Sequence, residues 1–204
     1  MNDQAAGLRE RKKHATREAL VRAGLELFVE RGYDETTLAE IADAAGVSTR
    51  TIFAYFPSKE DILFSTIERT SGALTRALQQ RPAGVDALTA LREFILSSAA
   101  EKTELDCRLA QAVTADPTLA SHRRARIGQL QEVLAAAIAD DLGVGPDDRR
   151  PQIAAASLTA AFELLELDVQ PGEWKAPTPD EVAAAVDPVL SFVRAGLDAT
   201  TNPA

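Results

Sequence analysis

The sequence predicts an all-α fold of about nine helices. Three observations lead to this prediction. Apolar residues recur at helical spacing along the chain, Ala and Leu are abundant while β-branched runs are few, and cap-forming residues precede several of the periodic segments. Hydrophobic residues make up 46% and charged residues 26% of the 204 residues, which is typical of a soluble globular protein.

The first third of the chain predicts four helices, each with a local start or stop signal. They are expected over about 14–31, 37–46, 49–55 and 59–80. Gly32 is suited to end the first helix, because a residue after a helix often takes a positive φ. Thr37, Ser48 and Ser58 can cap the next three, and the acids Glu40 and Asp61 would complete capping boxes.

The remaining two thirds predict five more helices. They are expected over about 88–99, 104–115, 117–143, 149–168 and 179–199. Asp116 and Pro117 form a cap followed by a proline in the first helical position. Thr178 with Glu181 predicts a capping box for the last helix, after a loop over 170–177.

Charge is distributed unevenly along the chain. The net charge is -9, but residues 8–17 hold five bases and one acid, whereas residues 61–204 carry the acid excess. No apolar run approaches the length of a membrane span, no apolar segment follows the basic N-terminus as in a secretory signal, and Cys107 is the single cysteine. We therefore expect a cytoplasmic protein with a local basic patch and no membrane association.

Catalytic and metal-binding patterns are weak. The chain has only two histidines, and no Ser/His/Asp or Cys/His constellation stands out. The acid pairs Asp140-Asp141 and Asp147-Asp148 lie at helix ends, where carboxylates are common, and neither has a His or Cys neighbour. The sequence therefore predicts no enzyme, no metal site and no cofactor.

Residues 37–56 fit a helix-turn-helix. Ala42 is small enough for the second helix to cross over the first, and Gly46 can take the positive φ of the turn. Ile41, Val47 and Ile52 are placed to fix the crossing. The second helix would present short polar and basic side chains to base edges at its N-terminal end, namely Ser48, Thr49, Arg50 and Thr51. An ordinary helical hairpin is the alternative.

The surrounding segment resembles the DNA-binding domain of the TetR family of bacterial transcriptional regulators. Residues 16–63 carry the resemblance, TREALVRAGLELFVERGYDETTLAEIADAAGVSTRTIFAYFPSKEDIL. The resemblance implies a three-helix DNA-binding head, a helical ligand-binding body and a homodimer without catalytic activity. It places the arm and helix-turn-helix in residues 1–60 and the ligand-binding and dimerisation domain in residues 61–204.

The same resemblance assigns roles to single residues of the head. Arg50 would grip guanine O6 and N7, although the family often has a small residue or proline there. Phe53 would touch a thymine methyl or a sugar, or else belong to the core. The expected phosphate contacts come from hydroxyl and basic side chains, which are Thr37, Tyr55, Lys59, Arg11, Lys12, Lys13 and Arg17. A solubilising tail is the alternative for the basic arm, and a solvated lysine for Lys59.

The body is similar to acyl-CoA-responsive members of the family over residues 106–143. An apolar ligand chamber is expected from side chains of several helices, Phe94, Leu105, Leu109, Val113, Leu130, Leu134 and Phe162. The bases of residues 122–126 could meet a phosphate-bearing head group, or they could solvate a helix face.

These features together predict a regulator that binds a palindromic DNA operator as a homodimer. Helices 149–168 and 179–199 are expected to form the dimer interface. The family usually represses, and a small apolar effector, such as an acyl-CoA or lipid-like molecule, would release the DNA. The alternative is a ligand-independent or architectural DNA-binding dimer.

Overall fold

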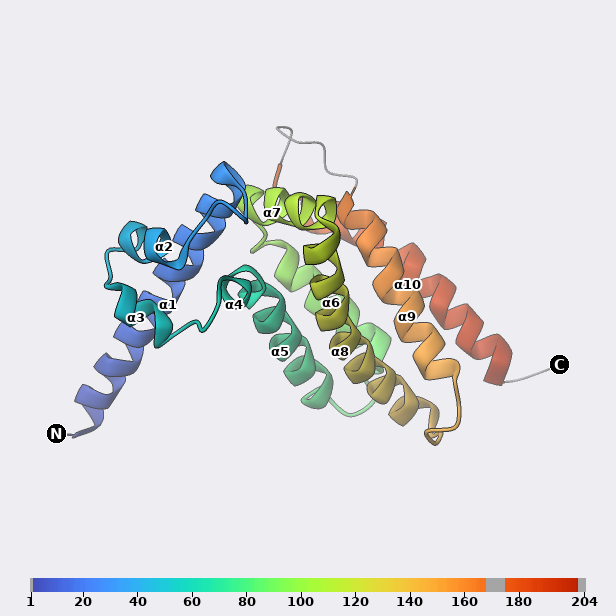
Figure 1. Cartoon of the computed structure of the whole chain (residues 1–204). Coiled ribbons are helices and arrows are strands. Elements are labelled where there is room, and N and C mark those ends of the chain that lie inside the picture. The colour runs from blue at the N-terminus through green and yellow to red at the C-terminus, as the bar shows by residue number, and fades with distance from the viewer. Residues whose placement is uncertain (1, 168–174, 202–204) are drawn as a thin grey trace. The chain divides into compact units, whose positions relative to one another are not determined.

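A computed structural model of the chain describes residues 2–167 and 175–201, which form ten helices and no strand (Figure 1). The all-α prediction is confirmed. Residue 168 and residues 170–174 of the expected loop lie outside the described part. The chain divides into two compact units, Met1–Thr66 and Ile67–Ala204. The expected domain boundary after residue 60 falls inside a short helix, Lys59–Leu63 (α4), which belongs to the first unit.

The first unit is a small helical head. Its helices are α1 (Asn2–Arg31), α2 (Leu38–Ala44), α3 (Thr49–Phe53) and α4. Helix α1 packs against α2 and α4, and α2 packs against α3. The buried apolar side chains of these elements include Leu20, Leu27, Phe28, Ile41, Ala42, Ile52, Phe56, Ile62 and Leu63. The short helices are therefore held by tertiary packing, since helices of five to seven residues are marginal alone.

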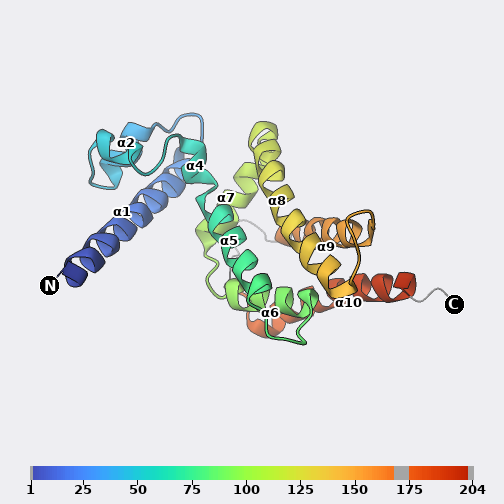
Figure 2. The ribbon, with the colours of Figure 1, turned by 90° about the horizontal axis from the view of Figure 1, so that it is seen from below.

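Helix α1 is longer than predicted. It begins at Asn2 rather than near residue 14, so the expected basic arm is part of the helix. The apolar stripe begins at Leu20, and the preceding residues are mostly Ala, Arg, Lys and Glu, which favour a helix without making it amphipathic. In both ribbon views the N-terminal part of α1 extends past α2 and α3 (Figures 1 and 2).

The expected fourth helix is divided in two. Helix α4 ends at Leu63, and α5 spans Ser65–Gln79. Between them Phe64 has φ -95° and ψ 3°. The buried hydroxyl of Ser65 donates to the Ile62 carbonyl at 2.7 Å. A serine side chain that bonds to nearby backbone competes with the helical ladder, which accounts for the break that the apolar pattern did not reveal.

The second unit is a bundle of longer helices. After α5 come α6 (Ala87–Ala99), α7 (Glu104–Ala115), α8 (Pro117–Leu142), α9 (Arg150–Leu167) and α10 (Pro179–Thr201). Helix α8 packs along α9, and α10 packs against both α6 and α9. The buried core draws on five of these helices and includes Leu74, Leu78, Leu88, Leu91, Leu134, Ile138, Leu158, Val186, Leu190 and Val193.

Local signals set several helix ends of this unit as predicted. The Asp116 carboxylate accepts from the backbone N–H groups of Thr118 at 2.8 Å and Leu119 at 3.0 Å. Gly143 follows α8 with φ +62°. The Thr178–Glu181 capping box precedes α10, with the Glu181 carboxylate accepting from the Thr178 backbone at 2.7 Å. Each signal satisfies backbone groups that a helix end leaves without a partner.

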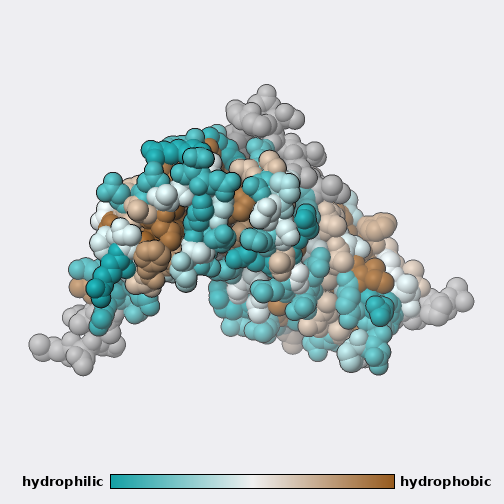
Figure 3. All heavy atoms as spheres, viewed as in Figure 1, coloured by the Kyte–Doolittle hydropathy of each residue, from teal (hydrophilic) through white to brown (hydrophobic). Residues whose placement is uncertain are grey.

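The surface is mixed in character. Figure 3 shows hydrophilic residues over most of one face, with hydrophobic residues gathered in separate patches. None of the helices in the described residues is long and apolar enough to cross a membrane.

Candidate nucleic-acid interface

The α2–α3 segment has the geometry of a helix-turn-helix. Gly46 takes φ +68° in the turn, a conformation that residues with a Cβ rarely adopt. The Val47 N–H donates to the Ala42 carbonyl at 2.9 Å, which closes the turn onto the end of α2. Ala42 is only 1% exposed, as its predicted place at the helix crossing requires. Ile41 and Ile52 are fully buried, while Val47 is half-buried.

Helix α3 turns one face to the core and the other to solvent. Ser48 caps it by accepting from the Thr51 N–H at 3.1 Å, and the two hydroxyls lie 2.7 Å apart. Thr49 and Arg50 are exposed, and Arg50 makes no hydrogen bond or ion pair with the described residues. The Arg50 guanidinium can therefore reach an external partner without first breaking a contact.

The two phenylalanines of α3 and the following turn are placed on opposite sides. Phe53 is 55% exposed and therefore does not belong to the core. Phe56 is 1% exposed and packs in the head core. The Arg17 guanidinium lies 4.3 Å from the centroid of the Phe56 ring and donates to the Tyr55 carbonyl at 3.5 Å. Arg17 thus joins α1 to the end of α3.

Two of the expected phosphate contacts are already occupied within the head. The Lys59 ammonium donates to the carbonyls of Tyr33, Asp34 and Thr36 at 2.7, 3.2 and 3.2 Å. These three bonds use all three ammonium hydrogens. The Thr37 hydroxyl donates to the Glu40 carboxylate at 2.8 Å, so that a protein anion stands where a phosphate was expected. These hydrogen bonds from the Thr37 side chain and backbone lower the pKa of Glu40.

The remaining predicted contacts of the head are exposed or half-buried. Tyr55 is half-buried and its hydroxyl has no hydrogen-bond partner among the described residues. Lys12 and Lys13 are exposed on α1, and their ammonium groups are likewise without a partner there. Arg11 bends back along its own helix, where Nε donates to the Gly7 carbonyl at 3.2 Å.

The residues expected to line a ligand chamber lie on α6, α7, α8 and α9 of the second unit. Leu134 is a core residue at 2% exposure, and Leu109 and Val113 are also buried. Phe94, Leu130 and Phe162 are partly buried and pack against the core. Leu105 is half-buried. Four of the seven residues, Leu134 with Phe94, Leu130 and Phe162, thus belong to the core of the bundle or pack against it.

The bases at the start of α8 differ in their exposure and contacts. His122 and Arg124 are exposed. Arg126 is turned to α5, where its Nε lies 3.8 Å from a Glu68 carboxylate oxygen. This arrangement favours the solvated helix face over a head-group site as the role of His122 and Arg124.

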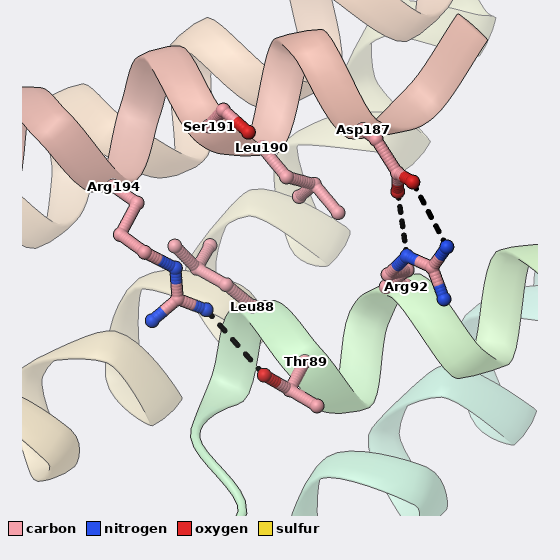
Figure 4. Close-up of a pocket in the computed structure, with 7 residues that line it drawn as sticks. All are labelled: Leu88, Thr89, Arg92, Asp187, Leu190, Ser191 and Arg194. Carbon is pink, nitrogen blue, oxygen red and sulfur yellow. Dashed lines mark hydrogen bonds and ion pairs between the residues drawn. The ribbon is translucent and has the colours of Figure 1, made fainter. Parts of the chain in front are cut away.

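A depression of about 270 Å³ lies between α6 and α10 (Figure 4). Leu88 and Leu190 contribute to its apolar part, and two further lining residues, Arg92 and Arg194, form ion pairs. Arg92 binds Asp187 through two nitrogens, at 2.5 and 2.9 Å. Arg194 binds both oxygens of Asp86, at 2.6 and 3.0 Å. The sequence analysis did not anticipate this depression, because its pairs join residues about a hundred positions apart.

Each ion pair lowers the pKa of its carboxyl group. The hydrogen bonds from Arg92 lower the pKa of Asp187, and those from Arg194 lower the pKa of Asp86 well below its usual range. Each guanidinium is therefore matched by a carboxylate at neutral pH. The two ion pairs therefore join α6 and its cap to α10, and they leave neither guanidinium unpaired for a ligand.

Two residues of the head were missed by the sequence analysis. A Cβ at Gly24 of α1 would lie 2.6 Å from a methyl carbon of Ile62, so glycine permits the close approach of α1 and α4. Arg9 follows the same spacing as Lys13 and Arg17. Arg9 is one of the five bases of residues 8–17, and its place on the same helix as Lys13 and Arg17 follows from the early start of α1. The closeness of Gly24 to Ile62 has no signal in the sequence.

The geometry of the head agrees with the comparisons to known proteins. Residues 20–66 match the family described as "Bacterial regulatory proteins, tetR family". The HTH-type transcriptional regulator TcmR of Streptomyces glaucescens is 45% identical over 85 residues, which cover 42% of this chain and 38% of TcmR. The chain thus spans less than half the length of the curated relatives it matches.

Solved structures extend the similarity to the body. Thermus thermophilus FadR, a TetR-family transcriptional repressor in complex with lauroyl-CoA, is 30% identical with a TM-score of 0.56, over 89% of this chain and 94% of that one. The complex of SmeT, from Stenotrophomonas maltophilia, with triclosan has a TM-score of 0.63 at 22% identity, over 87% of this chain and 91% of SmeT, and shows the shared fold. The helix-turn-helix and this full-length similarity lead to one conclusion: the chain belongs to the TetR family of bacterial transcriptional regulators.

Proposed function

We propose that this protein is a dimeric repressor that binds a palindromic operator through α3 and leaves it when a small, largely apolar molecule binds the body. The observation that carries the proposal is the outward face of α3. Thr49, Arg50 and Phe53 are exposed there, while Ile52 on the opposite face is fixed in the core. A recognition helix needs this division between a rigid inner face and free outer side chains.

The proposed base contacts follow from the chemistry of that face. The Arg50 guanidinium can bind guanine O6 and N7 in bidentate fashion. The hydroxyls of Ser48, Thr49 and Thr51 can bond base edges or phosphate, and the Phe53 ring can cover a thymine methyl group. Tyr55 is proposed to give its free hydroxyl to phosphate. Lys59 and Thr37 are left out of this set because their polar groups are used within the head.

The proposed dimer interface lies on α9 and α10. Ile153 and Phe192 are large apolar side chains at 63% and 78% exposure, one on each helix. Ala156, Ala160 and Ala195 are exposed on the same two helices, so a second copy could approach closely. Packing of α9 and α10 against their copies would give a four-helix bundle. Two heads related by a two-fold axis would read half-sites roughly 34–36 Å apart, or somewhat more.

The proposed effector is an acyl-CoA or a similar lipid-like molecule. The apolar side chains on α6 to α9 would enclose its hydrocarbon part. The similarity to FadR, whose structure contains lauroyl-CoA, supports this ligand class. The ligand would favour a body conformation in which the two heads no longer match the operator, which is a shift between existing states.

A selection experiment tests the proposal. The full-length protein would be incubated with a pool of random duplexes, and bound DNA would be sequenced over several rounds. We expect an inverted repeat to be enriched. Enrichment without a consensus, together with a steep salt dependence, would instead support the architectural alternative.

The effector is tested on the selected operator. Lauroyl-CoA, free coenzyme A and lauric acid would be added to the protein–DNA complex, and release would be followed by fluorescence anisotropy. Release by lauroyl-CoA alone supports an acyl-CoA repressor. Release by lauric acid as well points to a plain apolar ligand, and release by none of the three contradicts the proposed ligand class.

A further inference from the structure

A polar pair lies in the seam between α8 and α9. The Gln131 amide nitrogen donates to the Thr159 hydroxyl oxygen at 2.5 Å, and both side chains are half-buried. The two helices pack along each other and run in opposite directions (Figure 1). Gln131 lies three residues before Leu134, and Thr159 lies three residues before Phe162, both of which belong to the proposed apolar chamber. The pair therefore adjoins the apolar wall that would enclose the effector.

The two side chains of the pair differ in what they can still bind. The Thr159 hydroxyl donates back to its own helix, with the carbonyls of Ala155 at 3.1 Å and Ala156 at 3.0 Å, and its oxygen accepts from Gln131. The Gln131 amide has two N–H donors and a carbonyl oxygen, and the bond to Thr159 uses one of the donors. Its second N–H and its carbonyl oxygen form no hydrogen bond with the described residues. Gln131 thus keeps a donor and an acceptor for an external partner.

Open space lies close to Gln131, at Gly128. The two residues are three positions apart and therefore lie on the same side of α8. A Cβ at Gly128 would meet no atom within 4 Å, although the residue is half-buried. Glycine weakens the interior of a helix relative to alanine, so α8 does not gain stability from it. The helix thus combines an amide that can still bond with room for a small group beside it.

We propose that Gln131 is the specificity-determining residue of the effector site, and that the effector carries a hydroxyl group on its hydrocarbon part, which enters the space beside Gly128. This inference rests on the proposed function and adds the polar group by which the effector is recognised. A hydroxyl both donates and accepts, so it can use the carbonyl oxygen and the second N–H of the amide. A plain alkyl chain at the same place would cover the amide without bonding to it, which costs affinity.

Direct binding tests the inference. Lauric acid, β-hydroxylauric acid and ω-hydroxylauric acid would be titrated into the full-length protein and followed by isothermal titration calorimetry. The two hydroxy acids carry the hydroxyl near the carboxyl group and at the far end of the same chain. We expect at least one of them to bind about tenfold more tightly than lauric acid. Equal affinities of the three acids, or tightest binding of lauric acid, would overturn the inference.

Gln131→Leu tests whether this amide causes the preference. Leucine keeps most of the volume of the side chain and removes its polar groups, so the preference for the hydroxy acid should be lost while lauric acid binds at least as well. Gln129→Leu, at an exposed glutamine of the same helix, is the matched control and should keep the wild-type preference. A purely structural role of the bond to Thr159 would lower the thermal stability of Gln131→Leu and leave the preference intact, which would contradict the inference.

Gly128→Leu tests the space beside the amide. Leucine suits a helix interior and would fill the open space, so the variant should fold and bind the preferred hydroxy acid about tenfold more weakly. Ala136→Leu, at an exposed alanine of α8, is the control and should bind as the wild type does. Wild-type affinity in Gly128→Leu would show that the hydroxyl does not enter this space and would overturn its placement.

Failure of the proposed function gives a different pattern of results. If neither the three acids nor lauroyl-CoA bind the protein, the proposed effector class is removed together with the inference. If lauric acid or lauroyl-CoA binds and releases the operator, but neither hydroxy acid binds more tightly than lauric acid, the effector class stands and only the role of Gln131 is overturned.

Discussion

The Lys59 ammonium lies 2.7 Å from the Tyr33 carbonyl oxygen and 4.3 Å from the centroid of the Tyr33 ring. With its bonds to Asp34 and Thr36, it ties the start of α4 to the segment that links α1 and α2. From the sequence, a lysine in the first turn of this helix is expected to contact phosphate. In the structure, its ammonium instead bonds to backbone carbonyls of the head.

Lys59→Met tests this role. The variant keeps the length of the side chain but leaves three carbonyls without their donor, so the free energy of unfolding should fall by about 1–3 kcal/mol. The slope of log DNA affinity against log salt concentration should stay unchanged. Lys12→Met, at an exposed lysine whose ammonium has no partner among the described residues, is the control for urea denaturation. Unchanged stability with a slope reduced by about one would restore the phosphate role.

Arg50→Ala should affect sequence preference more than stability. Loss of a bidentate guanine contact costs about 1–3 kcal/mol at the selected operator and relaxes one base position. The measurement is a repeat of the duplex selection with the variant, with Arg22→Ala as the control on the far side of α1. An unchanged consensus would rule out base reading by Arg50.

Phe53→Ala and Phe56→Ala should separate DNA binding from folding. Phe53 is 55% exposed, so its truncation should change stability by no more than about 0.5 kcal/mol and still weaken operator binding. Phe56 is 1% exposed, and its truncation should cost about 3–5 kcal/mol. Thermal denaturation and anisotropy would be measured on both. Full operator affinity in Phe53→Ala would show that the exposed ring has no part in recognition.

Asp86 should make stability depend on pH in the acid range. Its carboxylate accepts from the Thr89 N–H at 2.7 Å as the cap of α6 and also binds Arg194. Because these contacts lower the pKa of Asp86, its contribution is present above 3.8, the ordinary carboxyl value, and is lost as pH falls below it. The advantage of the wild type over Asp86→Asn, measured by urea denaturation, should therefore shrink below that pH.

The cap and the ion pair of Asp86 can be measured apart at neutral pH. Asp86→Ser keeps a capping oxygen without the charge, whereas Asp86→Ala removes both. We expect Asp86→Ala to be less stable than Asp86→Ser by about 0.5–2 kcal/mol. Equal stabilities of the two variants would show that the cap adds nothing to α6.

Phe192→Lys should weaken the proposed dimer. The ring is 78% exposed in the single chain, so the protomer should keep its fold while a charge enters the apolar centre of the interface. A loss of about 2 kcal/mol or more in dimerisation free energy is expected, measured by analytical ultracentrifugation. Leu8→Lys, at another exposed apolar residue, is the control. A dimer of wild-type affinity would place the interface elsewhere.

Much of the fold was predictable because it depends on neighbours in the chain. Capping residues such as Thr37 and Asp116 bond to backbone groups two or three positions away, and Gly46 and Gly143 supply positive φ where a helix ends. Apolar periodicity then locates the buried face of each helix. The order of helices and the outward place of Arg50 follow from such local signals.

The tertiary structure decided what depends on residues far apart in sequence. It placed the Lys59 ammonium on the Tyr33 carbonyl, left Phe53 exposed to solvent and interrupted the helix at Phe64. The spacing of apolar residues in the sequence gives no sign of any of the three. The basic start of α1 has no apolar stripe, so its helical conformation and the contact of Arg17 with Phe56 emerge only from the structure. Sequence determines which side chains a helix carries, whereas packing decides the direction in which they point.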